Sequence, residues 1–179
     1  MRARRAAGAL FAAAALAFAG CGDDDKSTNS SSSDSGSTTA ASDATAEVQR
    51  DLKISTDLKK KPDVPSLSGL PPEKLMTKDI VPGTGAAAKQ GDKITVEYVG
   101  VSYSSDKEFD SSWGREPFEA QLASPGIIEG WVEGIQGMKQ GGRRALVIPP
   151  DLAYGMEGQP PDIAPYETLI FVIDLKKIG

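Results

Sequence analysis

Four segments decide the fold of this chain: ITVEYVGV at residues 94–101, KEFDSSWGREPF at 107–118, PGIIEGWVEGIQGMKQGGRRALVIPPDLAYG at 125–155 and ETLIFVIDLKKI at 167–178. Each segment contributes at least one aromatic ring, and six of these rings recur in separate short elements: Tyr98, Phe109, Phe118, Trp131, Tyr154 and Phe171. Rings supplied by several strands and one helix can line a single apolar pocket. Read alone, each ring would more often be a core residue.

Alternation of apolar and polar residues predicts half-buried strands in ITVEY, RRALVI and LIFVIDL. A further strand is expected at Leu75–Ile80, before the turn at Pro82-Gly83. The side chains predicted to face the core are Ile94, Val96, Tyr98, Leu146, Ile148, Leu169, Phe171, Ile173 and Leu175.

Between Ile127 and Met138 the apolar residues recur at helical spacing. Gly130, Gly134 and Gly137 lower the helix propensity, so this helix should be short and held by packing. One short helix across the concave face of an antiparallel sheet is an α+β fold.

The blocks resemble, in order and spacing, the FKBP-type (immunophilin) peptidyl-prolyl cis–trans isomerases over residues 73–179. They are E-Y-V-G around Tyr98, F-D-S-S at 109–112, P-F at 117–118, I-I-E-G-W at 127–131 and P-D-L-A-Y-G at 150–155. The resemblance implies a curved antiparallel half-barrel wrapped around the helix. It also implies isomerisation of X-Pro bonds without cofactor, metal or covalent intermediate, and the chain indeed has no histidine.

The resemblance also implies roles for individual residues. Trp131 would form the floor under the proline ring, while the N–H of Ile128 and the hydroxyl of Tyr154 would donate to substrate carbonyls. Asp110 would lie beside the twisting amide and orient Tyr98 or polarise the pocket. The walls and rim would be formed by Tyr98, Phe109, Phe118, Phe171 and Ile127.

The chain departs locally from the family pattern. The turn SSDKE before Phe109 is slightly longer than in the smallest members, Gln159 replaces a common His, and Asp162 replaces a common apolar residue. Gln159 and Asp162 leave the pocket floor intact but bear on substrate preference and on binding of macrolide inhibitors. These two residues motivate an alternative function, a protein-binding or holdase module that keeps the pocket without significant catalysis.

Residues 1–20 have the pattern of a secretory signal: three arginines, an apolar run from Ala6 to Ala19 and small residues at the end. The stretch LAFAG before Cys21 resembles a bacterial lipobox, with Phe18 in place of the more usual Leu. We therefore expect lipidation of Cys21, a membrane anchor and a position in the cell envelope outside the cytoplasm. A retained membrane anchor, or ordinary cleavage that leaves a free thiol, are the alternatives.

Residues 21–72 are expected to form a tether between the lipid and the domain at 73–179. Its first half is rich in Ser, Thr, Gly and Asp and has no apolar residue larger than Ala, which predicts a flexible spacer. The segment VQRDLKISTDLKK at 48–60 could form a short helix, but PDVPSLSGLPP after it is interrupted by proline and glycine. We therefore expect residues 47–72 to be a partly extended approach laid along the domain surface.

Charge argues against a nucleic-acid partner. Without residues 1–20 the chain keeps 17 basic and 25 acidic side chains, a net charge of −8. The basic groups at 59–61 and at Arg143-Arg144 are interpreted as solvated charges. The expected protein is a monomer that isomerises proline-containing exported polypeptides. A solute-binding role in transport is less favoured, because one small domain lacks a two-lobed cleft.

Overall fold

The computed structural model describes residues 52–179, so the expected signal peptide, Cys21 and the first part of the tether lie outside the described residues. Within this part, no helix is long and apolar enough to cross a bilayer. The elements are β1 (Met76–Val81), β2 (Lys93–Ser102), β3 (Glu108–Ser111), β4 (Phe118–Gln121), α2 (Glu129–Ile135), β5 (Arg143–Ile148), the 3-10 turn η1 (Pro150–Leu152) and β6 (Leu169–Ile178).

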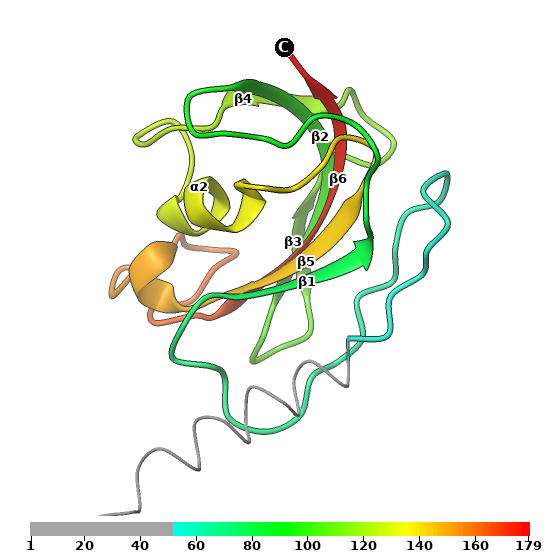
Figure 1. Ribbon diagram of the computed structural model, residues 1–179. Helices are drawn as coiled ribbons and strands as arrows, with labels where there is room; N and C mark the ends of the chain where they lie inside the picture. The colour runs from blue at the N-terminus through cyan, green and yellow to red at the C-terminus, as the bar shows by residue number, and fades with distance from the viewer. Residues whose placement is uncertain (1–51) are drawn as a thin grey trace, which may run out of the picture. The chain divides into compact units, whose positions relative to one another are not determined.

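All strand pairs are antiparallel, and the sheet has the order β1-β5-β6-β2-β3, with β4 paired to the first half of β2. The sheet bends around α2, which lies across its concave face (Figure 1). The α+β architecture predicted from the sequence is therefore confirmed. The first strand begins and ends one residue later than expected, at Met76 and Val81.

The concave face of the sheet carries the main hydrophobic core. Every side chain predicted to face the core lies in this cluster, together with Trp131, Ile135 and Met138 from α2 and the turn after it. Two helix glycines allow the close approach of α2 to β5. A Cβ added to Gly130 would lie 2.3 Å from Cγ2 of Ile148, and one added to Gly134 would lie 2.8 Å from Cδ2 of Leu146. Packing therefore holds a helix of weak intrinsic propensity, as the sequence predicted.

The convex face of the sheet is buried as well, which the prediction of half-buried strands did not include. Residues 52–72, which we call the strap, run over this face and bury Leu52, Ile54 and Leu67. The sheet contributes Met76, Val99, Val101, Tyr103, Ala145, Val147, Ile170 and Val172 to this second cluster. The strap therefore packs along the sheet, as expected for a segment laid along the domain surface.

Arg143 corrects the interpretation of the basic pair as solvated charges. Its side chain is fully buried, with Nε 2.6 Å from Oδ1 and Nη2 2.8 Å from Oδ2 of Asp174. The same guanidinium donates to the carbonyl oxygens of Ser55 at 2.6 Å and Lys60 at 3.1 Å in the strap. A buried charge requires hydrogen-bond partners of this kind, and the strap supplies two of the four acceptor atoms.

Candidate active site

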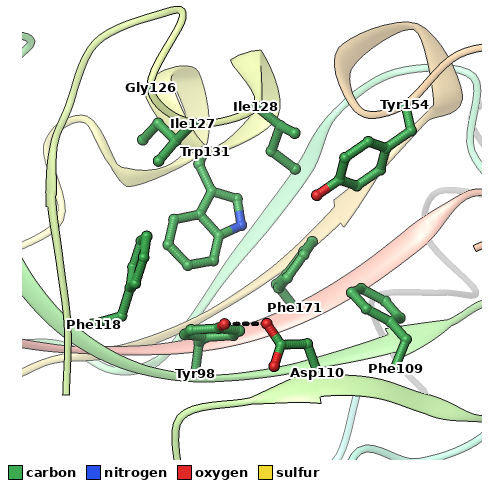
Figure 2. Close-up of a pocket in the computed structure, with 10 residues that line it drawn as sticks. All are labelled: Tyr98, Phe109, Asp110, Phe118, Gly126, Ile127, Ile128, Trp131, Tyr154 and Phe171. Atoms are coloured by element: carbon green, nitrogen blue, oxygen red, sulfur yellow. Dashed lines mark hydrogen bonds between the residues drawn. The ribbon is translucent and has the colours of Figure 1, made fainter. Parts of the chain in front are cut away.

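A pocket of about 220 Å³ opens between α2 and the concave face of the sheet. Its lining contains every residue predicted for the site, and only Gly126 is additional: Tyr98, Phe109, Asp110, Phe118, Gly126, Ile127, Ile128, Trp131, Tyr154 and Phe171 (Figure 2). The residues come from β2, β3, β4, α2 and the loop before it, the turn after η1, and β6. The volume is below the range of about 300–1,000 Å³ typical of drug-sized ligands, and it suits a ring the size of one residue.

The aromatic rings meet edge to face around the indole of Trp131, which is 4% exposed. The Trp131 ring centroid lies 5.2 Å from that of Tyr98, 5.3 Å from that of Phe171 and 6.0 Å from that of Phe118. Phe109 packs against Phe171 at 5.5 Å and 87°. Phe118 is the most exposed ring, at 38%, so it forms the outer lip of the pocket. Such contacts fix each ring and keep the pocket open.

Two local features let β3 place adjacent side chains in the pocket. Gly100 pairs with Asp110 and Val101 with Glu108, so Phe109 is an extra residue in β3, a β-bulge. The bulge lets Phe109 and Asp110 both line the pocket. Gly100 lies beneath the rings, because an added Cβ would be 2.6 Å from Cζ of Phe109 and 2.8 Å from Cε1 of Phe171.

The polar side of the pocket is a chain of three side chains. The hydroxyl of Tyr98 donates to Oδ2 of Asp110 in a very short hydrogen bond, and Nη2 of Arg115 lies 2.6 Å from Oδ1 of the same carboxylate. Arg115 also donates to the carbonyl oxygen of Ser111. Arg115 was not predicted as a site residue, since an arginine in a polar turn has no sequence feature that separates it from a solvated charge.

These contacts set the protonation states. Burial raises the pKa of Tyr98, and the hydrogen bond and negative charge of Asp110 raise it further. Burial also raises the pKa of Tyr154, with a second contribution from the charge of Asp110. Burial alone would raise the pKa of Asp110, but the hydrogen bonds from Tyr98, Arg115 and the Ser111 N–H outweigh it and leave that pKa lowered. At neutral pH the pocket therefore holds two phenols and one carboxylate.

Three hydrogen-bond donors around the pocket have no acceptor within residues 52–179. The N–H of Ile128 lies at the N-terminus of α2, where the residue is extended, and makes no hydrogen bond. The hydroxyl of Tyr154 is likewise unpaired, and the indole N–H of Trp131 is buried without a partner. A bound group with carbonyl oxygens would satisfy donors of this kind.

The pocket has the features of a binding site for an apolar ring flanked by carbonyl groups. Among the described residues, no cluster of acidic or cysteine side chains could hold a metal ion. Gln159 and Asp162, the departures noted in the sequence, are both exposed and outside the lining. The backbone of Gln159 pairs with that of Ile163 in the loop after Tyr154.

Comparison with known proteins agrees with this geometry. A family model described as FKBP-type peptidyl-prolyl cis-trans isomerase matches residues 85–176. An FK506-binding protein of Streptomyces anulatus is 51% identical over 117 residues, which cover 64% of this chain and 94% of the relative. A probable FK506-binding protein of Corynebacterium glutamicum is 48% identical over 115 residues, covering 64% and 96%. The crystal structure of a peptidyl-prolyl cis-trans isomerase from Pseudomonas syringae pv. tomato has a TM-score of 0.56 and 31% identity, covering 78% of this chain and 91% of that one.

Proposed function

Because this chain belongs to the FKBP-type peptidyl-prolyl cis–trans isomerase family, we propose that its aromatic pocket accelerates rotation about X-Pro bonds of exported polypeptides. One observation carries the proposal: the side chains expected for such a site all line the same pocket. They come from five separate elements and the turns beside them, so their meeting depends on the whole fold.

The pocket chemistry fits catalysis without a covalent intermediate. Rotation of an amide faces a barrier of about 18–20 kcal/mol, which arises from resonance between the nitrogen and the carbonyl. A proline ring seated on Trp131 would place the preceding carbonyl in an apolar, water-poor site, which favours the twisted amide over the planar one. The hydroxyl of Tyr154 and the N–H of Ile128 would hold the flanking carbonyls, and Asp110 would fix Tyr98. Lowering the barrier by about 5–8 kcal/mol corresponds to roughly four to six orders of magnitude in rate.

A protease-coupled assay on a short X-Pro peptide tests the proposal. The full chain carrying Cys21→Ser, which avoids the lipid, should accelerate isomerisation, and Trp131→Ala should lower kcat/KM by at least about tenfold. Tyr166→Ala is the matched control, because Tyr166 is an exposed ring outside the pocket. A rate equal to the uncatalysed one, from folded protein, would exclude the enzyme.

The alternative is a binding or holdase module. Exposed Met156 and Tyr166 on the loops after Tyr154 favour it, since they add apolar surface beyond the pocket. Suppression of aggregation that persists in Trp131→Ala, with no isomerase activity in the parent chain, would support this alternative.

The family's relatives include proteins named for binding FK506. We therefore propose that a macrolide of that type occupies the same pocket and competes with X-Pro substrates. Inhibition of the peptide assay by FK506, reduced in Trp131→Ala, is the expected result. Inhibition that is equally strong in both proteins would place the macrolide elsewhere.

The proposed place of action is the outer side of a membrane, with the lipid on Cys21 and the domain on its tether. The sequence of residues 1–46 supports this part of the proposal. Cys21→Ser should release the protein from the membrane fraction without changing the activity on peptides. A variant that stays in the membrane fraction would instead indicate an uncleaved anchor.

A further inference from the structure

We infer that the strap, residues 52–72, is a positioning element of the active site: it holds β3 from the convex face on both sides of Phe109 and Asp110. The inference rests on the proposed isomerase function for its kinetic consequence. Lys61 is the positioning residue that the structure singles out, because its side chain reaches the strand that carries the pocket residues.

β3 needs support from outside the sheet. It has only four residues, it lies at the edge of the sheet and it pairs with β2 alone, through three residue pairs interrupted by the bulge at Phe109. A short, bulged edge strand has few hydrogen bonds to hold its register. Yet this strand supplies one aromatic wall of the pocket and the carboxylate that fixes Tyr98.

The first support lies just before the pocket residues. Glu108 pairs with Val101, whose side chain belongs to the convex cluster, so Glu108 points to the strap while Phe109 and Asp110 line the pocket. Nζ of Lys61 lies 2.7 Å from Oε1 of Glu108. Both side chains are 43% exposed, which leaves the pair accessible to substitution without opening the core.

The second support lies just after the pocket residues. The ring of Trp113, two residues beyond the end of β3, packs against the convex cluster, which the strap also covers. Nζ of Lys176 lies 5.4 Å from the centre of that ring and 3.5 Å from the carbonyl oxygen of Leu58. The strap is therefore linked to the chain before Phe109 directly, through Lys61, and to the chain after Asp110 through Lys176 and Trp113.

The strap is itself fixed to β1 and β5, so it can hold β3 in place relative to these two strands. Lys78 of β1 donates to the carbonyl of Leu52 at 3.1 Å, and Arg143 of β5 donates to the carbonyl of Lys60 at 3.1 Å. Lys61 therefore follows directly on a residue held by the buried Arg143–Asp174 pair. This geometry connects β1 and β5 to β3 through a segment outside the sheet.

The test compares charge reversals in the full chain carrying Cys21→Ser. Lys61→Glu places two acids together and should lower kcat/KM for an X-Pro peptide by about two- to fivefold, with little change in the thermal midpoint. The double variant Lys61→Glu/Glu108→Lys restores an ion pair and should recover the activity. Lys59→Glu is the matched control, because this neighbouring exposed lysine makes the same charge change without a side-chain partner in the described residues.

Two readouts separate failure of this inference from failure of the proposed function. Hydrogen exchange at the amide of Ser112, which donates to the carbonyl of Tyr98 at 3.1 Å, should quicken in Lys61→Glu, and amides of the β5–β6 pair should not change. Binding of the peptide, followed by NMR, should weaken in Lys61→Glu and recover in the double variant even if the parent chain shows no catalysis. Unchanged exchange, or unchanged binding together with unchanged kcat/KM, would overturn the inference.

Discussion

The absence of a side chain at Gly100 allows the rings of Phe109 and Phe171 to occupy their positions in the pocket wall. An added Cβ would lie under the rings of Phe109 and Phe171, at 2.6 Å and 2.8 Å, so both rings would have to shift from their present positions. Gly100→Ala should therefore lower kcat/KM by about tenfold or more and destabilise the fold by about 1–3 kcal/mol. Steady-state kinetics and urea unfolding measure both effects.

Gly126→Ala is the comparison for that substitution. Gly126 also lines the pocket, but a Cβ there would meet only the carbonyl oxygen of Ala123, at 3.6 Å. A much smaller loss of activity is expected. Equal losses in the two variants would mean that the ring positions above Gly100 are not what limits the reaction.

The titratable groups of the pocket predict a flat pH profile. The pKa values of Tyr98 and Tyr154 are raised above the usual value of a phenol, the pKa of Asp110 is lowered, and the chain has no histidine. None of these groups changes charge between about pH 5 and pH 9. We expect kcat/KM to vary by less than about twofold over that range. A bell-shaped profile would indicate a proton-transfer step and contradict catalysis by binding alone.

Asp110 also links stability to pH, with a defined sign. The pKa of Asp110 is lower in the folded state than in the unfolded chain. The ionised carboxylate therefore stabilises the fold at pH values above the unfolded-state pKa. This contribution disappears as the pH falls through the folded-state pKa. The urea midpoint of Asp110→Asn should lie below that of the parent chain at pH 7. The two midpoints should converge toward pH 3. A constant difference across that range would show that Asp110 does not contribute through its charge.

At the scale of elements, the sequence predicted the parts of the fold that follow a period. Alternation identified the concave face of β2, β5 and β6, and helical spacing identified α2. The burial of the convex face was not predicted. In RRALVI and LIFVI, however, the alternate positions, whose side chains point to the convex face, are also apolar, for example Val147 and Ile170. Apolar residues at both parities are the signal of a strand that is buried on both faces.

A segment laid along the domain surface was predicted at residues 47–72, but the side chains that the strap buries and the buried ion pair that it helps to hold could not be found in this way. The strap has no hydrophobic period. It accepts the hydrogen bonds of Arg143 through backbone carbonyl groups, and because every residue has such a group, the sequence does not mark these two. Arg115 and Gly100 act through contacts across the fold, which local composition does not encode. The pocket was predicted because each of its rings lies in a recognisable block.

The contact between α2 and β5 gives a prediction for an element. Alanine is a better helix former than glycine by about 1 kcal/mol, so Gly130→Ala would stabilise an isolated helix. Here the added Cβ would lie 2.3 Å from Cγ2 of Ile148, so the substitution should destabilise the protein by about 1–3 kcal/mol in urea unfolding.

A double variant that removes the clash between residues 130 and 148 tests this explanation. Gly130→Ala combined with Ile148→Ala, which removes the opposing methyl groups, should cost less than the sum of the two single changes. Additive costs would mean that α2 shifts freely on the sheet and that its distance from β5 is not fixed by these two residues.

At the scale of the whole molecule, the strap makes the compact unit larger than its recognisable blocks. A chain that begins at residue 73 would lose the cover of the convex cluster and the two carbonyl acceptors of Arg143. Each hydrogen bond to a buried charged group contributes about 1.5–3 kcal/mol, and the exposed apolar side chains add to that loss. We therefore expect the chain 73–179 to be less stable than the chain 47–179 by at least about 3 kcal/mol, or not to fold at all.

Urea unfolding of the two chains, followed by the fluorescence of Trp131 and Trp113, measures that difference. A third chain with an intact strap and Arg143→Met separates the two contributions, since it removes the charge and leaves the apolar cover. Because removal of Arg143 leaves the buried Asp174 with only Lys176, at 3.9 Å, as a charged partner among the described residues, this variant should also lose stability, and Arg143→Met/Asp174→Leu should recover much of it. Equal midpoints for 73–179 and 47–179 would show that the sheet and α2 suffice for the fold and that the strap only lies on its surface.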